Sequence, residues 1–86
     1  MYSGSDERAE FSNRLISSLV QLGWTKLSPT RFAEQFNQRA GTVDAVKLHG
    51  ARKWLVGSAI PTQARIEILA SWLKVSADWL RPFGYT

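Results

Sequence analysis

With 86 residues, the chain is long enough for one hydrophobic core and too short for two, so we expect a single domain over residues 1–86. It has no cysteine, no signal-peptide pattern and no apolar run near the roughly 20 residues that cross a bilayer, so we expect a soluble, cytoplasmic protein. Residues 25–65 carry a net charge of +5, whereas the whole chain carries +4, so the positive excess lies in this segment. It points to a polyanionic partner, although a solvated basic surface would give the same charge.

Helical periodicity runs through almost the whole chain. Residues 1–5 are polar and are expected to be disordered. A first helix is predicted over about residues 6–22, ended by Gly23, because apolar residues recur there at spacings of four, four and three: Phe11, Leu15, Leu19 and Leu22.

A second helix is predicted over about residues 29–38. Ser28 is a natural N-cap, and Pro29 stands at the first helical position, where its missing N–H costs nothing. The inward face of this helix would carry Phe32, Ala33 and Phe36. The local structure of residues 40–45 is harder to predict, because Gly41 and Thr42 favour a loop whereas the following apolar run favours an ordered connection.

Three shorter helices are predicted in the rest of the chain. The third covers about residues 48–56, with Gly57 as a left-handed C-cap and a core face of Ala51, Trp54 and Leu55. Thr62 caps the fourth, which continues to about Lys74 on an inner stripe of Ile66, Leu69, Ala70 and Leu73. Ser76 caps a last short helix. Five helices without a strand candidate predict a compact all-α bundle.

The third helix would separate its charge from its core contacts. On a helical wheel, Ala51, Trp54 and Leu55 lie together, whereas His49, Arg52 and Lys53 fall on the remaining arc. A short helix anchored on one side and basic on the other suits reading of the DNA major groove, because that groove admits one helix.

At these residues the chain resembles the lambda-repressor-like (Cro/repressor, XRE-type) helix-turn-helix domains, in particular the phage and prophage regulator branch. The similarity spans about residues 10–84. It rests on "LSPTRFAEQF", on "ARKWLVGSAIPT" with Trp54, Gly57 and Pro61, and on a leucine-rich segment followed by a "WL" pair, namely Leu69, Ala70, Leu73, Val75, Trp79 and Leu80.

The resemblance implies a five-helix bundle in which the second and third helices bind DNA and the third enters the major groove. Carried over position by position, it implies a base-contacting set of Lys47, Leu48, His49, Gly50, Arg52 and Lys53. It implies a backbone-contacting set of Ser28, Thr30, Arg31, Thr62 and Arg65. The implied partners are double-stranded DNA and, at least on DNA, a second copy of the chain.

The chain departs from the family pattern between its second and third helices. The connection, in "NQRAGTVDA", is about eight residues longer than in compact members. Lys47 also occupies the place where Ser or Thr usually caps the recognition helix. The third helix could therefore begin at Thr42, which would shift the base-reading set towards Asp44 and Lys47. The later start is preferred, because Gly50 is a poor mid-helix residue.

The single histidine and the aromatic residues also have expected roles apart from DNA binding. His49 is the only histidine and has no partner ligands, so we expect no metal or cofactor. Trp54, Trp72 and Trp79 fall on apolar stripes and are expected in the core. Trp24, Phe83 and Tyr85 could cover the end of the bundle or form a self-association patch.

The sequence favours a sequence-specific DNA-binding transcriptional regulator. The seven carboxylates are scattered, and no Ser-His-Asp constellation or phosphate-binding glycine loop is present, so an enzyme is not expected. The alternative is a protein-interaction module, such as an antitoxin or adaptor, that uses the same basic face.

Overall fold

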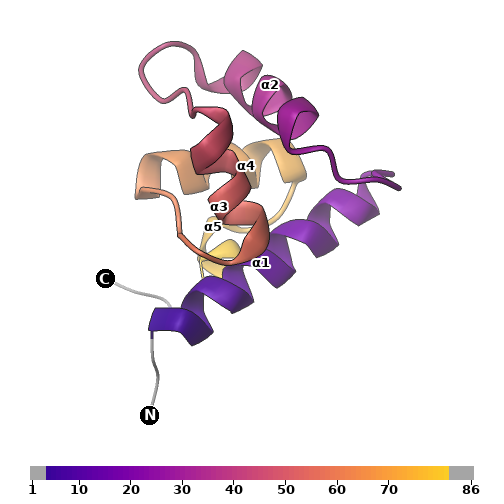
Figure 1. Ribbon diagram of the computed structural model, residues 1–86, viewed down its shortest axis with the longest axis vertical. Coiled ribbons are helices and arrows are strands. Elements are labelled where there is room, and N and C mark those ends of the chain that lie inside the picture. The colour runs from indigo at the N-terminus through magenta and orange to yellow at the C-terminus, as the bar shows by residue number, and fades with distance from the viewer. Residues whose placement is uncertain (1–3, 82–86) are drawn as a thin grey trace.

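The computed structural model describes residues 4–81, which form five α-helices and no β-strand (Figure 1). The predicted all-α five-helix architecture is confirmed. The helices are α1 (Gly4–Gln21), α2 (Pro29–Ala40), α3 (Leu48–Val56), α4 (Gln63–Leu73) and α5 (Ala77–Leu80). Of the two starts left open for the third helix, the structure has the later one. α1 begins inside the segment expected to be disordered, and residues 1–3 lie outside the described part.

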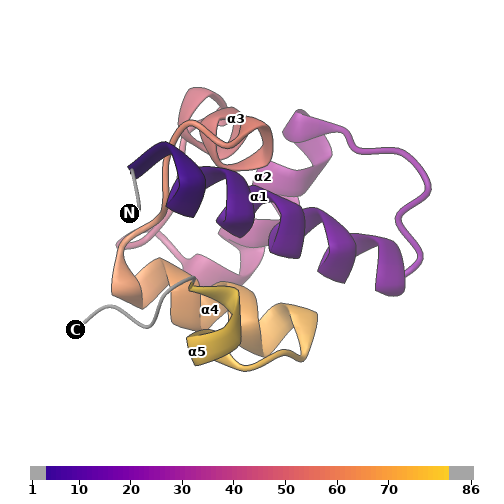
Figure 2. The ribbon, with the colours of Figure 1, turned by 90° about the horizontal axis from the view of Figure 1, so that it is seen from below.

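The long helix α1 crosses the molecule with α3 on one side and α4 and α5 on the other (Figure 2). Its predicted face of Phe11, Leu15 and Leu19 is fully buried. The Ser12 hydroxyl, also buried, donates to the carbonyl oxygen of Leu55 at 2.7 Å and so ties α1 to the end of α3. Leu22, predicted on the same stripe, is 41% exposed, because it follows the end of the helix.

Aromatic rings from α2, α3 and α4 form the centre of the core. Phe32 stacks on Trp72 with ring centroids 5.7 Å apart, and Phe36 meets Trp54 edge to face at 5.3 Å. Phe32 also meets Trp54 edge to face at 6.2 Å. Because Phe32 and Phe36 are one helical turn apart, both rings of α2 reach the indole of α3. This packing fixes α3 against α2.

Trp79 was expected in the core, and that prediction is wrong. Its side chain is 43% exposed, and the guanidinium carbon of Arg14 lies 5.5 Å from its ring centroid. The reason is the shortness of α5, which is a single turn. That turn directs Leu80 into the core, fully buried, so the neighbouring side chain must point outward.

The two remaining tryptophans close one end of the bundle. Trp24 is half-buried and meets Trp72, itself half-buried against the core, edge to face at 6.0 Å. Of the two roles expected for Trp24, covering the end of the bundle is present, and self-association stays a prediction. The predictions for Phe83 and Tyr85 lie outside the described residues.

The predicted helix caps are present. The side chains of Ser28, Thr62 and Ser76 each accept a hydrogen bond from the backbone N–H three residues later. Gly57 ends α3 in the left-handed region, at φ 79° and ψ 29°, and its N–H donates to the carbonyl oxygen of Lys53. These residues set the ends of the helices that carry the candidate site.

Replacing Gly57 with alanine should lower the free energy of unfolding by about 1–2 kcal/mol, because a Cβ disfavours the left-handed conformation. The added Cβ would also lie 3.4 Å from the Cα of Ala9 in α1. Urea unfolding followed by circular dichroism measures the change. Gly57→Asn is the control, since asparagine tolerates this conformation better and should lose less. An alanine variant as stable as the parent would contradict the explanation.

Candidate nucleic-acid interface

Helix α3 presents its basic residues away from the core, as predicted. Ala51, Trp54 and Leu55 are buried, with the indole only 4% exposed. The opposite arc consists of exposed side chains: His49, Arg52, Lys53 and Val56. Successive residues advance by about 100° around a helix, so these four necessarily share one face.

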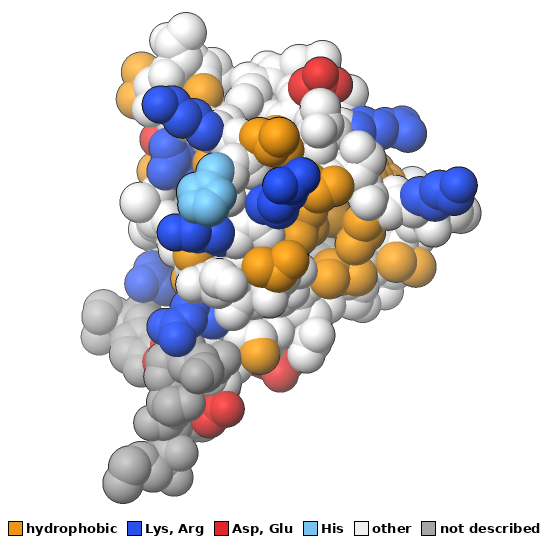
Figure 3. Space-filling view, in the orientation of Figure 1, with side chains coloured by type: hydrophobic (Ala, Val, Ile, Leu, Met, Phe, Trp, Pro, Cys, Tyr) orange, Lys and Arg blue, Asp and Glu red, His pale blue; other side chains and the backbone are white. Residues whose placement is uncertain are grey.

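The cations of α3 are not used to hold the fold together. Within residues 4–81, no hydrogen bond or ion pair involves the side chains of Lys47, Arg52 or Lys53, and all three are exposed. Figure 3 shows basic side chains gathered around the histidine, while the acidic side chains in view lie at the margins of this face. The arrangement leaves positive charge free for an external anion.

The first turn of α3 carries no side-chain cap at its N-cap position. Lys47 is the N-cap residue, and its side chain makes no capping hydrogen bond. Leu48, the first helical residue, is 40% exposed beside His49. The backbone N–H groups of such a turn point along the helix axis and can donate hydrogen bonds to a phosphate oxygen.

The start of α2 supplies a second set of predicted contacts. Thr30 and Arg31 are exposed, and Ser28, half-buried, accepts from the N–H of Arg31 at 3.2 Å. The guanidinium of Arg31 lies 5.0 Å from the ring centroid of Trp24, so it stacks on the aromatic end of the bundle while its edge stays accessible. Thr62, predicted as a further backbone contact, is exposed and caps α4.

Arg65 has a role within the fold that the sequence did not reveal. Its Nε donates to the carbonyl oxygen of Asp44 and its Nη2 to that of Ala45, each at 2.9 Å. The guanidinium thus holds the connection between α2 and α3, 20 and 21 residues away in sequence. No local pattern could have indicated it, because neither partner is near Arg65 in the chain.

Asn37 holds the same connection from α2 and was also missed. Its side-chain amide donates to the carbonyl oxygen of Val46 at 2.9 Å, and its side-chain oxygen accepts from the N–H of Val46 at 2.8 Å. These two hydrogen bonds hold the N–H and the carbonyl of Val46, as pairing between β-strands would. They fix the backbone of the residue just before Lys47. The start of α3 is therefore positioned by α2 as well as by the core.

Close packing against Val46 leaves no room for a side chain at Gly50. A Cβ built there would lie 2.8 Å from Cγ2 of Val46, closer than side chains approach. Its side of α3 therefore packs directly against the connection that Asn37 holds. The resemblance implied that Gly50 lies near DNA, and the contact with Val46 is an additional constraint.

Gly50→Ala should destabilise the protein even though alanine favours a helix by about 1 kcal/mol. The cost of overpacking against the stiff Val46 side chain, about 1–3 kcal/mol, exceeds that gain. Urea unfolding measures the difference. The double variant Gly50→Ala, Val46→Ala should recover part of the loss, because the clashing methyl group is gone. A Gly50→Ala variant more stable than the parent would refute the steric account.

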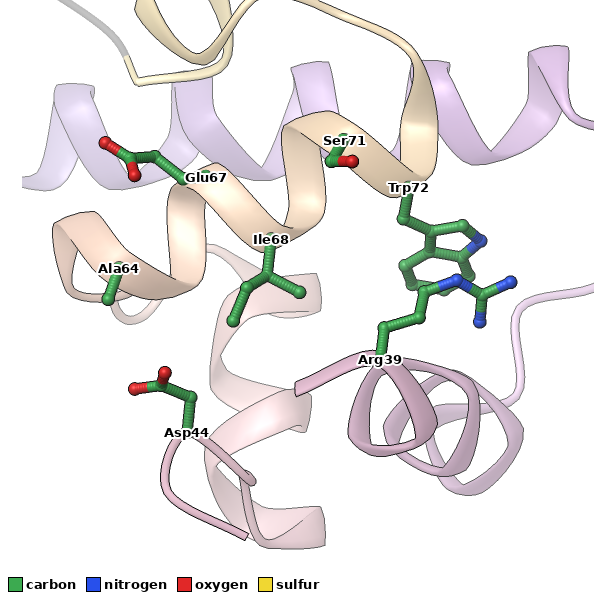
Figure 4. Close-up of a pocket in the computed structure, with 7 residues that line it drawn as sticks. All are labelled: Arg39, Asp44, Ala64, Glu67, Ile68, Ser71 and Trp72. Atoms are coloured by element: carbon green, nitrogen blue, oxygen red, sulfur yellow. The ribbon is translucent and has the colours of Figure 1, made fainter. Parts of the chain in front are cut away.

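An open groove lies between the end of α2, the α2–α3 connection and α4 (Figure 4). At one end the guanidinium of Arg39 lies 4.7 Å from the ring centroid of Trp72, and at the other end stand the carboxylates of Asp44 and Glu67. The described residues bring no three potential metal ligands together, and none of their helices is long and apolar enough to span a membrane. The basic face of α3 is the stronger candidate for a binding site.

Most of the residues on which the family resemblance rests lie in the core or at a helix end. Trp54 and Gly57 anchor and end α3, Pro61 is buried in the following turn, and Leu69 and Leu73 face the core from α4. The exposed arc of α3 can neutralise phosphates and donate hydrogen bonds to base edges. Scans of protein-family models, of curated proteins and of solved structures each found no match to this chain.

Proposed function

We propose that the protein is a sequence-specific DNA-binding regulator of the lambda-repressor-like type, with α3 in the major groove. The observation that carries the proposal is the exposed set of His49, Arg52 and Lys53, whose side chains have no partner within residues 4–81, on a helix whose other face is packed into the core. A fixed helix with free cations can be inserted into a groove without losing internal contacts.

The contacts divide into two groups. Lys47, His49 and Arg52 read base edges, and Arg52 suits guanine because a guanidinium can donate two hydrogen bonds to O6 and N7. Ser28, Thr30 and Arg31 at the start of α2, with Thr62 at the start of α4, contact phosphates and set the register. Arg65 was expected among the phosphate contacts, and its two hydrogen bonds to the α2–α3 connection now favour a positioning role.

The proposal includes partners and location. A domain of this size makes few DNA contacts, so tight binding calls for two copies on a two-fold symmetric site. The regulator would act in the cytoplasm, on the nucleoid, without a metal or cofactor and without enzymatic activity.

Selection from random duplexes tests this proposal. The full chain is incubated with a library of random double-stranded DNA, bound duplexes are amplified, and enriched sites are compared. We expect one enriched motif with two-fold symmetry and binding that weakens steeply with salt, by about one counterion per phosphate contact. A protein-interaction module would instead enrich no motif, and that result would overturn the proposal.

A further inference from the structure

The connection between α2 and α3 is held in place more firmly than a simple link requires. It is longer than the compact helix-turn-helix pattern, and two side chains brace it with four hydrogen bonds of 2.8–2.9 Å. Asn37 reaches it from α2 and Arg65 from α4. Loops braced from both sides keep one conformation and lose little entropy on binding.

An apolar side chain stands on this braced loop. Val43 is 88% exposed, the most exposed large hydrophobic residue among those described. A single exposed valine is common on protein surfaces and means little alone. Here it follows Gly41, which ends α2 with φ 71°, and precedes the residues that Arg65 holds. The brace therefore presents a stiff, β-branched side chain at a fixed place.

The loop lies beside the proposed DNA-reading face. It leads directly into Lys47 and α3, and Figure 1 shows it at the end of α3 where that helix begins. In the same orientation, Figure 3 shows hydrophobic side chains at this end of the basic cluster around the histidine. A duplex bound along α3 would therefore run close to this loop, which carries Val43.

We propose that Val43 is a specificity-determining residue that contacts the 5-methyl group of a thymine at the edge of each half-site. This inference rests on the proposed function. The thymine methyl is the apolar feature of the major groove, so it is the group there that an exposed valine can recognise. The carboxylate of Asp44, beside Val43, lies in the groove with Ala64 and Glu67 (Figure 4), whereas Lys47 is exposed at the start of α3; the exposed cation favours a nucleic acid over an apolar protein surface as the occupant.

Two other DNA contacts fit Val43 less well. An aliphatic side chain has no hydrogen bond or charge to offer a phosphate. The side chains that wedge between base steps enter the minor groove, which α3 would not occupy, and most of them are larger than valine. A thymine methyl requires only van der Waals contact, which a short branched side chain provides.

Uracil substitution tests the inference. Each thymine of the enriched duplex is replaced in turn by uracil, which lacks only the methyl group, and the dissociation constant is measured by fluorescence anisotropy. At one thymine per half-site, we expect the parent to lose about fourfold in affinity, the equivalent of one buried methyl. Val43→Ala should lose affinity for the thymine duplex and bind both duplexes alike. Val20→Ala is the matched control, since Val20 is an exposed valine on α1.

If the hydrogen bonds from Arg65 to the loop position Val43, a second result is expected. Arg65→Met keeps an unbranched stem but removes both hydrogen bonds to the loop, so it should reduce the thymine-to-uracil ratio at the same position. A general loss of stability would not change that ratio. If Arg65→Met weakens thymine and uracil duplexes equally and leaves the ratio intact, the brace does not position Val43.

The outcomes separate this inference from the proposed function. If an enriched motif exists but no uracil substitution distinguishes the parent from Val43→Ala, the Val43 contact is wrong and the DNA-binding function stands. If the site contains no such thymine, the contact is equally wrong. If no duplex is enriched at all, both proposals fall together.

Discussion

Trp54→Ala should lower the free energy of unfolding by about 3–5 kcal/mol, the range for removing a buried aromatic side chain. Domains of this size are stable by only about 5–15 kcal/mol, so a substantial unfolded fraction is expected at moderate temperature. The indole contacts Phe32 and Phe36 of α2 and is almost fully buried, so its loss leaves a cavity between α2 and α3. Urea unfolding followed by circular dichroism measures the change.

Trp79→Ala is the matched control, because the same ring is removed from a site that is 43% exposed. We expect a smaller loss than for Trp54, because this ring is partly exposed, lies outside the core cluster and contacts Arg14. Equal losses for the two variants would contradict the anchoring role of Trp54. The structure, and not the sequence, distinguishes these two tryptophans.

Helix boundaries were predictable because the signals that set them are local. Ser28 and Thr62 cap the helices that follow them, and Gly57 ends α3 in the left-handed conformation, all as the sequence indicated. The inward faces of α2, α3 and α4 were equally predictable, because buried residues repeat at helical spacing. These signals act over three or four residues and need no knowledge of the fold.

Contacts between distant residues were not predictable. Arg65 and Asn37 reach the α2–α3 connection across 21 and 9 residues, and neither has a sequence signature for that role. Trp79 was misplaced because a single-turn helix is too short for a periodic pattern to decide which side faces inward.

The candidate site was predicted in part. Helical geometry alone places Arg52 and Lys53 on the arc opposite Trp54, and the structure leaves both exposed. What the sequence could not give is the rigidity of the surroundings, since Asn37 and Val46 fix the start of α3 through tertiary contacts. Rigid placement matters because base readout depends on side-chain positions to within a fraction of an ångström.

Arg52→Ala should reduce discrimination at one base pair of the selected site by about 1–3 kcal/mol, which corresponds to roughly 5- to 150-fold. The expected cause is the loss of two hydrogen bonds from the guanidinium to guanine. Stability should be unchanged, because Arg52 is exposed and makes no hydrogen bond or ion pair within residues 4–81. Anisotropy titrations of the selected duplex and its single-base variants, at one salt concentration, measure the effect.

Lys53→Ala provides the comparison. Lys53 is exposed on the same arc and carries the same charge as Arg52, but its ammonium group cannot donate two parallel hydrogen bonds to one base as a guanidinium can. It should weaken all duplexes by a similar factor and reduce the slope of log affinity against log salt by about one. The two variants thus separate base reading from charge neutralisation on a single helix. If Arg52→Ala preserves the parent's affinity ratios among the single-base variants, Arg52 acts only through its charge, and base reading must come from Lys47 and His49.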